Sequence, residues 1–265
     1  MIQLQAPAKI NLFLRALHKR TDGYHELASL LQTIGLADTL TLKLADKDTF
    51  SCSDPCLQGE DNLAIKALRL FRRHVNRPFF VACTLEKKIP LQAGLGGGSS
   101  DAAAMLIGLN RLLESPLADD ELCKLASELG SDVPFFLKGG SAFCQGRGER
   151  ITPLSPLACK TVWIIKPPFG LSTPEVYRAL NIAGLKPRCP HTSLSEHLQG
   201  QGEYYNDLEG AALLLRPQLA TLKHTLLASG FSTVLLSGSG SAFFCLGDGS
   251  PSLSPDHFVC KTRFL

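Results

Sequence analysis

Pro90-Leu91-Gln92-Ala93-Gly94-Leu95-Gly96-Gly97-Gly98-Ser99-Ser100-Asp101-Ala102 joins a glycine cluster to the apolar helical pattern of residues 102–113. Glycines lack a Cβ atom, so their backbone N–H groups can turn inward around an anion, and the N-terminus of the following helix adds a partial positive charge. The segment therefore predicts a phosphate-binding loop that leads into a helix. A tight strand-to-helix turn, in which the glycines serve only close packing, is the alternative.

Neither of the two common glycine-rich phosphate loops fits this segment. A P-loop ends in Gly-Lys-Ser/Thr, whereas Gly98 is followed by Ser99 and Ser100 with no basic residue. The dinucleotide fingerprint Gly-x-Gly-x-x-Gly, counted from Gly94, requires a glycine where Ser99 stands. The mismatches argue against a P-loop ATPase and against a dinucleotide-dependent oxidoreductase.

Length and composition fit a catalytic protein with one large domain or two small ones. The 265 residues are 45% hydrophobic, and the net charge of +3 is small and not concentrated as in a nucleic-acid-binding protein. The N-terminus lacks the features of a signal peptide, and no run approaches the roughly 20 apolar residues that span a bilayer. We expect a cytoplasmic protein that binds neither nucleic acid nor membranes.

The nine cysteines predict free thiols. Their number is odd, no Cys-x-x-Cys occurs, and no histidine stands near a cysteine at the spacing of metal ligands. We therefore expect reduced cysteines, several of them inside strands, and no cysteine-based metal site.

Periodicity predicts a mixed α and β chain. Residues 39–44 and, more loosely, 79–85 alternate with period two, as strands with one buried face do. Asp61 is the expected N-cap of a helix over 61–75, Ser99 or Ser100 that of the next helix, and Gly130 a left-handed stop after a helix over 119–129. Further strands are expected at 135–137, 142–144, 161–165, 231–236 and 242–246, and further helices from 173 and over 207–229 with an interruption at Pro217. Pro153 and Pro156 suggest a domain boundary near 155.

Lys9 and Asn11 stand two residues apart in the otherwise apolar, strand-like stretch 7–14. They are therefore expected on one face of the strand. A lysine there must meet solvent, a ligand or a counter-charge, because burying it unpaired is costly. An edge-strand lysine that reaches water is the alternative to a functional one.

Asp132 supplies a carboxylate in the turn Gly130-Ser131-Asp132-Val133-Pro134. By itself this position fits an N-cap or an Asx-turn as well as a functional role. Together with Lys9 and the glycine loop it forms a minimal set for phosphoryl transfer: a carboxylate that accepts a hydroxyl proton, a cation that neutralises developing charge, and amides that hold phosphates.

Three ordered segments resemble the motifs of the GHMP kinases, the superfamily of galactokinase, homoserine kinase, mevalonate kinase and phosphomevalonate kinase. They are residues 7–12, 90–102 and the small-residue turn 236–242. The resemblance implies an α+β fold, with an N-terminal ATP-binding domain similar to ribosomal protein S5 domain 2 over 1–155 and a C-terminal ferredoxin-like α/β sandwich over 156–265. It also implies that Lys9 and Asp132 are the catalytic residues.

The same resemblance implies ATP as co-substrate, together with Mg²⁺. Lys87 and Asn62 match positions near the adenosine. No metal ligand is assigned, and Ser100 is the first candidate. The residues implied to wrap the ATP phosphates are Pro90, Leu91, Gln92, Ala93, Gly94, Leu95, Gly96, Gly97, Gly98, Ser99 and Ser100.

Segments between the shared motifs resemble one branch of these kinases, which phosphorylates the 2-hydroxyl of a sugar alcohol carrying a cytidine diphosphate group in isoprenoid precursor biosynthesis. In that branch Tyr24 and Tyr177 would sandwich the cytosine and His25 would bond its edge, with Asn11 and Thr173 also binding substrate. Considered apart from this resemblance, Tyr24 and His25 are ordinary residues to find beside a turn at Asp22-Gly23. The segments are residues 20–25, 59–63, 130–136, 166–177 and 206–209.

Two alternatives stay open beside this interpretation. One is another GHMP small-molecule kinase of the homoserine or mevalonate type, and the other is a catalytically silent nucleotide sensor, which would be expected to lack Lys9 or Asp132. We expect a phosphotransferase with an alcohol acceptor that is a monomer or a weak homodimer.

Overall fold

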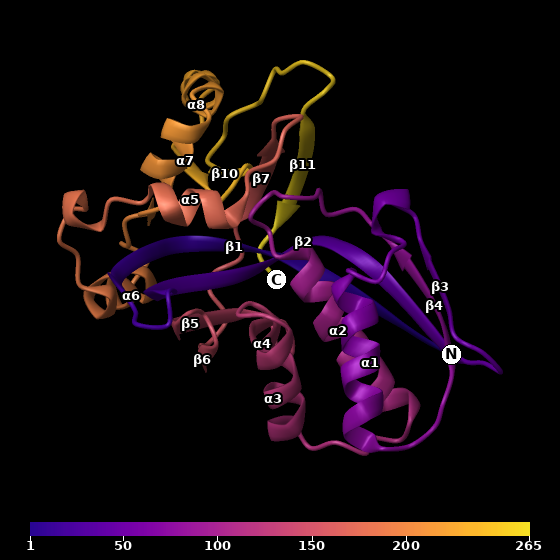
Figure 1. The fold of residues 1–265 in the computed structure, drawn as a ribbon. Helices are drawn as coiled ribbons and strands as arrows, with labels where there is room; N and C mark the ends of the chain where they lie inside the picture. The colour runs from indigo at the N-terminus through magenta and orange to yellow at the C-terminus, as the bar shows by residue number, and fades with distance from the viewer. The chain divides into compact units, whose positions relative to one another are not determined.

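The computed structural model describes all 265 residues, which form two compact units that interleave along the chain. The first unit contains Met1–Ala8, Leu36–Ile89 and Gly96–Gly139, and the second contains Lys9–Gly35, Pro90–Leu95 and Gly140–Leu265. The long strands β1 (Ile2–Lys19) and β2 (His25–Leu44) contribute residues to both units (Figure 1).

The first unit packs helices on a short sheet. Its sheet pairs β2 with β4 (Val81–Glu86) in antiparallel register from Thr39 opposite Glu86 onward, and β4 pairs in parallel with β3 (Thr49–Cys52). A Cβ atom on Gly108 would lie 2.5 Å from Leu42 Cδ1, so the helix that contains Gly108 packs closely on β2. The helices are η1 (Pro55–Leu57), α1 (Leu63–Val75), α2 (Gly97–Leu112), α3 (Asp119–Leu129) and α4 (Val133–Phe136).

The sequence located α1 to within two residues but assigned the wrong N-cap. Asn62, not Asp61, caps this helix, because the Asn62 side chain accepts a hydrogen bond from the Ala64 N–H at 2.9 Å. The helix ends at Asn76 in the left-handed conformation, with φ +46°. Ala64, Ala67 and Phe71 form its buried face. Two adjacent residues with good capping side chains are not distinguishable by composition.

The segment after α3 differs from prediction in two ways. Gly130 has φ 167°, which is extended backbone, and not the left-handed conformation expected of it. Residues 135–137 do not form a strand, because Phe135 and Phe136 lie in the short helix α4, which has Pro134 in its first turn. A run of three apolar residues has no period that separates a strand from a helix, whereas proline in a first turn favours a helix.

The second unit contains the strands expected at 142–144, 161–165, 231–236 and 242–246, and both predicted helical regions. Its four-stranded sheet is antiparallel in the order β11-β7-β10-β9, with Phe243 opposite both Ile165 and Leu236. β5 pairs with β2 and β6, and β8 pairs in parallel with β1. The elements are β5 (Ser141–Gly146), β6 (Arg150–Pro153), β7 (Thr161–Lys166), α5 (Thr173–Ala179), η2 (Ile182–Gly184), α6 (Pro190–Leu198), β8 (Tyr205–Asn206), α7 (Glu209–Leu215), α8 (Gln218–Ala228), β9 (Thr233–Leu236), β10 (Phe243–Leu246) and β11 (Phe258–Arg263).

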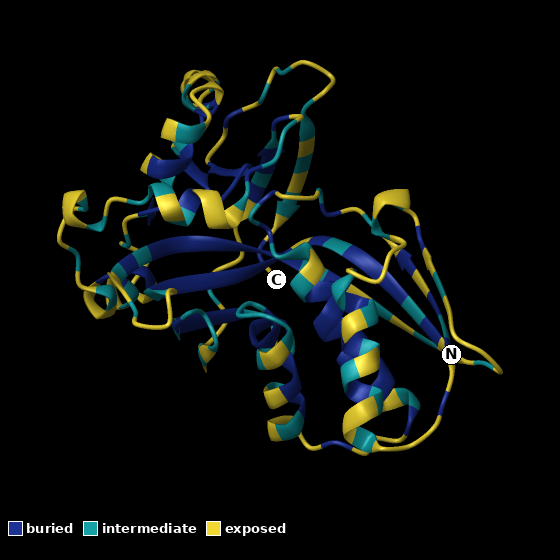
Figure 2. Cartoon of the chain, in the orientation of Figure 1, coloured by how far each residue is buried: buried dark blue, intermediate teal, exposed yellow.

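The core of the second unit lies between its four-stranded sheet and helices α5, α7 and α8. Leu219, Leu222 and Leu226 of α8 turn toward the sheet, and the opposite side of this helix is exposed (Figure 2). All four residues of β10 are buried. The alternation of buried and exposed positions along the helices is the amphipathic pattern that drives such packing.

Free cysteines and short helices are features of both units. All nine cysteines are free, and Cys52, Cys83, Cys144, Cys245 and Cys260 lie in strands, as predicted. None of the helices combines the length and the apolar character required to cross a bilayer.

Candidate functional site

Strand β1 brings Lys9 and Asn11 to one side, as the alternation predicted. Lys9 is 4% exposed, and its Nζ donates to Asn11 Oδ1 at 2.7 Å. Asn11 Nδ2 in turn donates to Ser29 Oγ at 2.8 Å, and the Ser29 hydroxyl donates to the Phe13 carbonyl at 2.6 Å. Lys9 is therefore not an edge-strand lysine that reaches water. Its Nζ bonds into a buried chain of side chains formed by Asn11 and Ser29.

The first half of the glycine loop, residues 90–95, is tied to β1 and to the turn after β9. We call residues 237–242 the serine turn. Besides a side-chain bond from Ser237 Oγ to Gly94 O at 3.1 Å, three backbone bonds fix this half. They run from Lys9 N–H to Leu95 O (2.9 Å), from Ser241 N–H to Gln92 O (3.0 Å) and from Ala242 N–H to Ala93 O (3.1 Å).

Gly94 is the position in this half where a side chain is excluded. Its φ is +73°, and an added Cβ atom would lie 1.9 Å from the Ser237 carbonyl oxygen. Because that neighbour is backbone, it cannot swing aside as a flexible side chain would. Close packing against the serine turn, the alternative to phosphate binding, is therefore one reason for a glycine at position 94.

The second half of the loop, Gly96 onward, opens α2 in the first unit. Gly96 caps the helix in the left-handed conformation with φ +73°, so neither Ser99 nor Ser100 is the N-cap that the sequence suggested. The hydrogen bonds of the helix begin at Ser100, whose N–H donates to Gly96 O at 2.9 Å. The N–H groups before it are the unsatisfied donors and positive dipole end that attract anions.

Lys87 lies beside this helix start, between two buried carboxylates. Its side chain is 7% exposed and its Nζ contacts Asp38 Oδ2 and, at 2.6 Å, Asp101 Oδ2. Asp38 also accepts backbone bonds from Lys88 (2.5 Å) and Ile89 (2.8 Å). Lys87, predicted near the adenosine, thus secures the base of the loop through Asp101, the fifth residue of α2.

Burial raises the pKa of Asp101 to about 7, with Lys87 opposing the shift and Asp38 adding to it. An unfolded aspartate ionises near about pH 4. Between these values the folded chain retains a proton that the unfolded chain has lost, so the free energy of unfolding falls as pH rises. We expect Asp101→Asn to remove this slope, which is at most about 1.4 kcal/mol per pH unit.

Urea unfolding at pH 5, 6, 7 and 8 measures this slope. Asp61→Asn is the control, because Asp61 is a fully exposed aspartate of the same unit. Equal slopes in the original protein and in Asp101→Asn would contradict the assignment of the titration to Asp101.

Asn62 is the second residue predicted near the adenosine, and its side chain makes hydrogen bonds to the protein backbone. Its Oδ1 caps α1, and its Nδ2 donates to the Leu57 carbonyl at 2.9 Å. An adenine at this place would therefore meet an amide whose orientation is already set.

Asp132 occupies the N-cap position of α4 in the first unit, whereas Lys9 belongs to the second. It is half-buried, with φ −86° and ψ −14°, and its side chain makes no capping hydrogen bond to the helix. The capping role that the turn sequence allowed for Asp132 is therefore absent from α4.

The three aromatic residues predicted for base binding all lie in the second unit. The rings of His25 and Tyr177 stack with centroids 5.2 Å apart and planes 26° from parallel. Tyr24 is 54% exposed, and its backbone N–H bonds Asp22 Oδ1 at 3.1 Å within the turn between β1 and β2. Burial, and then the charge of Lys19, lowers the pKa of His25, so its ring is neutral at pH 7 and has one donor and one acceptor.

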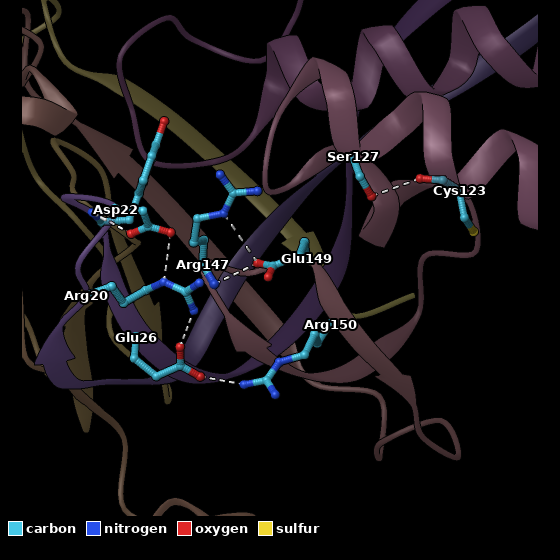
Figure 3. Close-up of polar contacts among 9 residues, drawn as sticks. Arg20, Asp22, Glu26, Cys123, Ser127, Arg147, Glu149 and Arg150 are labelled. Carbon is cyan, nitrogen blue, oxygen red and sulfur yellow. Dashed lines mark hydrogen bonds and ion pairs between the residues drawn. The ribbon is translucent and has the colours of Figure 1, made fainter.

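Figure 3 shows a charged network that includes Arg147, a residue that sequence analysis missed. The guanidinium of Arg147 lies 4.9 Å from the centre of the Tyr24 ring, as in cation–π pairs. Glu149 accepts from the Arg147 backbone N–H at 2.6 Å. Arg20 joins Asp22 (3.0 Å) and Glu26 (2.5 Å), and Glu26 also contacts Arg150. Nothing local in the sequence links residues so far apart.

Thr173, predicted to bind substrate, begins α5 and faces the serine turn. Its Oγ1 and Ser239 Oγ are 2.8 Å apart. In the second unit, hydrogen bonds thus join Lys9, Asn11, the loop half 90–95, the serine turn and Thr173. The stacked rings of His25 and Tyr177, and the Tyr24 ring with Arg147 beside it, lie in the same unit.

Comparison with known families places the glycine loop in a defined domain. Residues 62–140 match the model of the GHMP kinases N terminal domain. This range includes Asn62, Lys87, the whole glycine loop and Asp132.

Comparison with curated proteins finds relatives over most of the chain. The 4-diphosphocytidyl-2-C-methyl-D-erythritol kinase of Protochlamydia amoebophila is 50% identical over 94% of this chain and 85% of its own length. The chloroplastic enzyme of the same name from Arabidopsis thaliana is 39% identical over 97% of this chain and 70% of its own length.

Comparison with solved structures gives the same result for the fold. A crystal structure of 4-(cytidine 5'-diphospho)-2C-methyl-D-erythritol kinase matches with a TM-score of 0.84 and 38% identity over 99% of both chains. The mevalonate kinase of Methanococcus jannaschii matches with a TM-score of 0.72 and 15% identity, which bears on the fold alone. The predicted α+β GHMP kinase fold is confirmed.

Proposed function

The chain belongs to the family of 4-diphosphocytidyl-2-C-methyl-D-erythritol kinases, and from this we propose that it transfers the γ-phosphoryl group of ATP to the 2-hydroxyl of 4-diphosphocytidyl-2-C-methyl-D-erythritol. It is a kinase of isoprenoid precursor biosynthesis that acts on a small molecule with ATP as co-substrate. The observation that carries the finer proposal is the stacked pair His25 and Tyr177 beside the exposed Tyr24, because aromatic faces and a neutral imidazole edge suit a cytosine ring.

We assign the chemical step to Asp132 and Lys9. Asp132 orients the acceptor hydroxyl and takes its proton, and Lys9 neutralises the charge that develops on the transferred group. Because phosphoryl transfer proceeds through a loose transition state, positioning contributes more than the basicity of Asp132. The amides of residues 90–100 hold the ATP phosphates, and Asn11 and Thr173 orient the acceptor.

Mg²⁺ is the metal that the residues at the start of α2 fit. The hydroxyl oxygen of Ser100 and Asp101 Oδ1 are both buried and have no hydrogen-bond partner. Mg²⁺ prefers such oxygens and otherwise keeps waters and phosphate ligands, so few protein ligands are needed. When bound, it would neutralise negative charge on the ATP phosphates. Ser100 is the first ligand to test.

Three coarser features complete the proposal. We propose that residues 1–155 and 156–265 correspond to the ATP-binding and C-terminal domains of the family, although both compact units contain residues from before 155. We further propose a cytoplasmic monomer or weak homodimer.

Label transfer from ATP marked at its γ-phosphate tests the acceptor. We expect the cytidyl substrate to be labelled, and mevalonate and homoserine to remain unlabelled. Labelling of mevalonate or homoserine alone would move the protein to another branch of the GHMP kinases. ATP binding without labelling of any of the three would favour the nucleotide sensor.

His25→Ala and Tyr177→Leu are expected to raise KM for the cytidyl substrate by about 10- to 100-fold and to leave KM for ATP unchanged, because base stacking is worth about 1–3 kcal/mol. Steady-state kinetics with each substrate varied in turn measure this split. Tyr204→Leu is the matched control, since Tyr204 also contacts a histidine ring in the second unit, at 5.1 Å from His197. Equal KM values in His25→Ala, Tyr177→Leu and the control would contradict base recognition by this pair.

A further inference from the structure

The serine turn depends on an amide from a distant segment. Its own backbone bonds run from Ser237 N–H to Ala242 O (2.9 Å) and from Gly240 N–H to Ser237 O (2.8 Å). A residue outside the turn binds two further carbonyl groups. Asn206 Nδ2 donates to the carbonyl of Leu236, just before the turn, at 2.8 Å and to that of Gly238, within it, at 2.7 Å. A side-chain amide nitrogen has two N–H groups, so one nitrogen serves both carbonyls.

The side-chain amide of Asn206 is held in one orientation. Asn206 is 8% exposed, and its Oδ1 accepts a bond from Leu208 N–H at 2.9 Å, which fixes the orientation of the amide. Both N–H groups and the oxygen are therefore engaged. A buried polar group with all its partners in place is a rigid element of a fold.

Strand β1 anchors this asparagine. Asn206 lies opposite Leu14 in the parallel pair of β8 and β1, and the next residue, Asp207, donates its N–H to Leu14 O at 3.0 Å. The Asp207 carboxylate accepts from Ala16 N–H at 2.9 Å and from Arg15 Nη1 at 2.8 Å. The strand that holds Asn206 is the strand that carries Lys9 and Asn11.

The serine turn approaches Lys9 closely at Gly238. An added Cβ atom on Gly238 would lie 3.2 Å from Lys9 Nζ and 3.4 Å from Asn11 Oδ1. Gly238 has φ +51°, so the Asn206 bond to its carbonyl also holds a peptide that glycine could otherwise rotate.

We infer that Asn206 is a positioning residue of the reaction: it fixes the Gly238 peptide against the Lys9 ammonium and so sets the place of that charge. The inference rests on the proposed function for the role of Lys9. That Asn206 fixes the serine turn follows from its hydrogen bonds and does not depend on the proposed function. A displacement of about 1 Å at a reacting centre lowers rates by about 10²-fold, so a loosened turn is expected to reduce kcat.

Asn206→Asp tests this inference, because the substitution keeps the size of the side chain and replaces the donor by an acceptor that repels both carbonyls. We expect kcat to fall by about 10²-fold. Amide hydrogen exchange of residues 237–242 should become faster in the protein without substrates.

Asn110→Asp is the control for lost stability alone. Asn110 is also 8% exposed, its Nδ2 donates to Leu117 O and its Oδ1 accepts from Leu117 N–H, both at 3.0 Å. We expect Asn110→Asp to keep the original kcat and the original exchange of residues 237–242. Both variants are measured below the urea concentration at which either unfolds.

Two results would overturn the inference. One is a kcat for Asn206→Asp within about twofold of the original, whatever the exchange shows, since a twofold change is only about 0.4 kcal/mol. The other is an equal loss of kcat in Asn110→Asp, which would make the effect one of stability. If the original protein failed to phosphorylate the cytidyl substrate, the proposed function would fall, and unchanged exchange of residues 237–242 in Asn206→Asp would still count against the inference.

Discussion

Asp132→Asn is expected to lower kcat by about 10³-fold, because the amide cannot take the hydroxyl proton although it has nearly the same shape. Lys9→Ala is expected to reduce kcat by a similar factor, since about 10²- to 10³-fold follows from removing one preorganised donor to a developing charge. KM for ATP should change little in Asp132→Asn. Single-turnover measurement of phosphoryl transfer separates the chemical step from product release.

Folding must be verified in both variants, because Lys9 is buried and bonded to Asn11. Circular dichroism and urea unfolding provide this check. Lys66→Ala is a suitable control, because Lys66 is a half-exposed lysine of α1 whose partner Asp61 is fully exposed. Near-normal rates in folded Asp132→Asn and Lys9→Ala together would remove these residues from the mechanism.

Gly94→Ala is expected to destabilise the protein by about 3 kcal/mol or more and to abolish activity. The left-handed backbone alone costs about 1–2 kcal/mol for alanine. The methyl group would also overlap the Ser237 carbonyl, since its position is 1.9 Å from that oxygen, and overpacking adds about 1–3 kcal/mol. Relief of this overlap requires residues 90–95 and the serine turn to separate.

Gly140→Ala separates the two contributions. Gly140 has nearly the same φ, +71°, and an added Cβ atom would meet nothing within 4 Å. We expect this variant to lose only about 1–2 kcal/mol and to keep its activity. Equal free energies of unfolding for the two variants would show that contact with the serine turn contributes nothing.

Sequence reasoning located most elements where periodicity was long or punctuation was strong. The strand over 161–165, the helix over 119–129 and the break at Pro217 agree with the structure within about two residues. The strand predicted over 39–44 is only the last part of β2, which begins at His25. Sequence reasoning failed at Phe135 and Phe136, where three apolar residues have no usable period, and at the caps of α1 and α2, where neighbouring residues compete for one position.

The candidate site divides in the same way. Lys9 and Asn11 were predictable as a pair because their spacing is that of one strand face, and the structure joins them at 2.7 Å. The partners of Lys87 were not predictable, because Asp38 and Asp101 are distant in the chain and become neighbours only after the sheet and α2 pack. The same holds for Arg147 over Tyr24 and for Asn206 under the serine turn.

The hydrogen bonds from Ser241 and Ala242 to residues 92 and 93 also determine when, during synthesis, residues 90–95 can take up their folded conformation. The ribosome releases the glycine loop long before it makes the serine turn, since domains emerge N-terminus first. Until the turn exists, residues 90–95 lack the partners that fix them. A nascent or prematurely ended chain would therefore present residues 90–95 without these partners. On the proposed assignment of this loop to the ATP phosphates, ATP binding becomes a property of the finished protein.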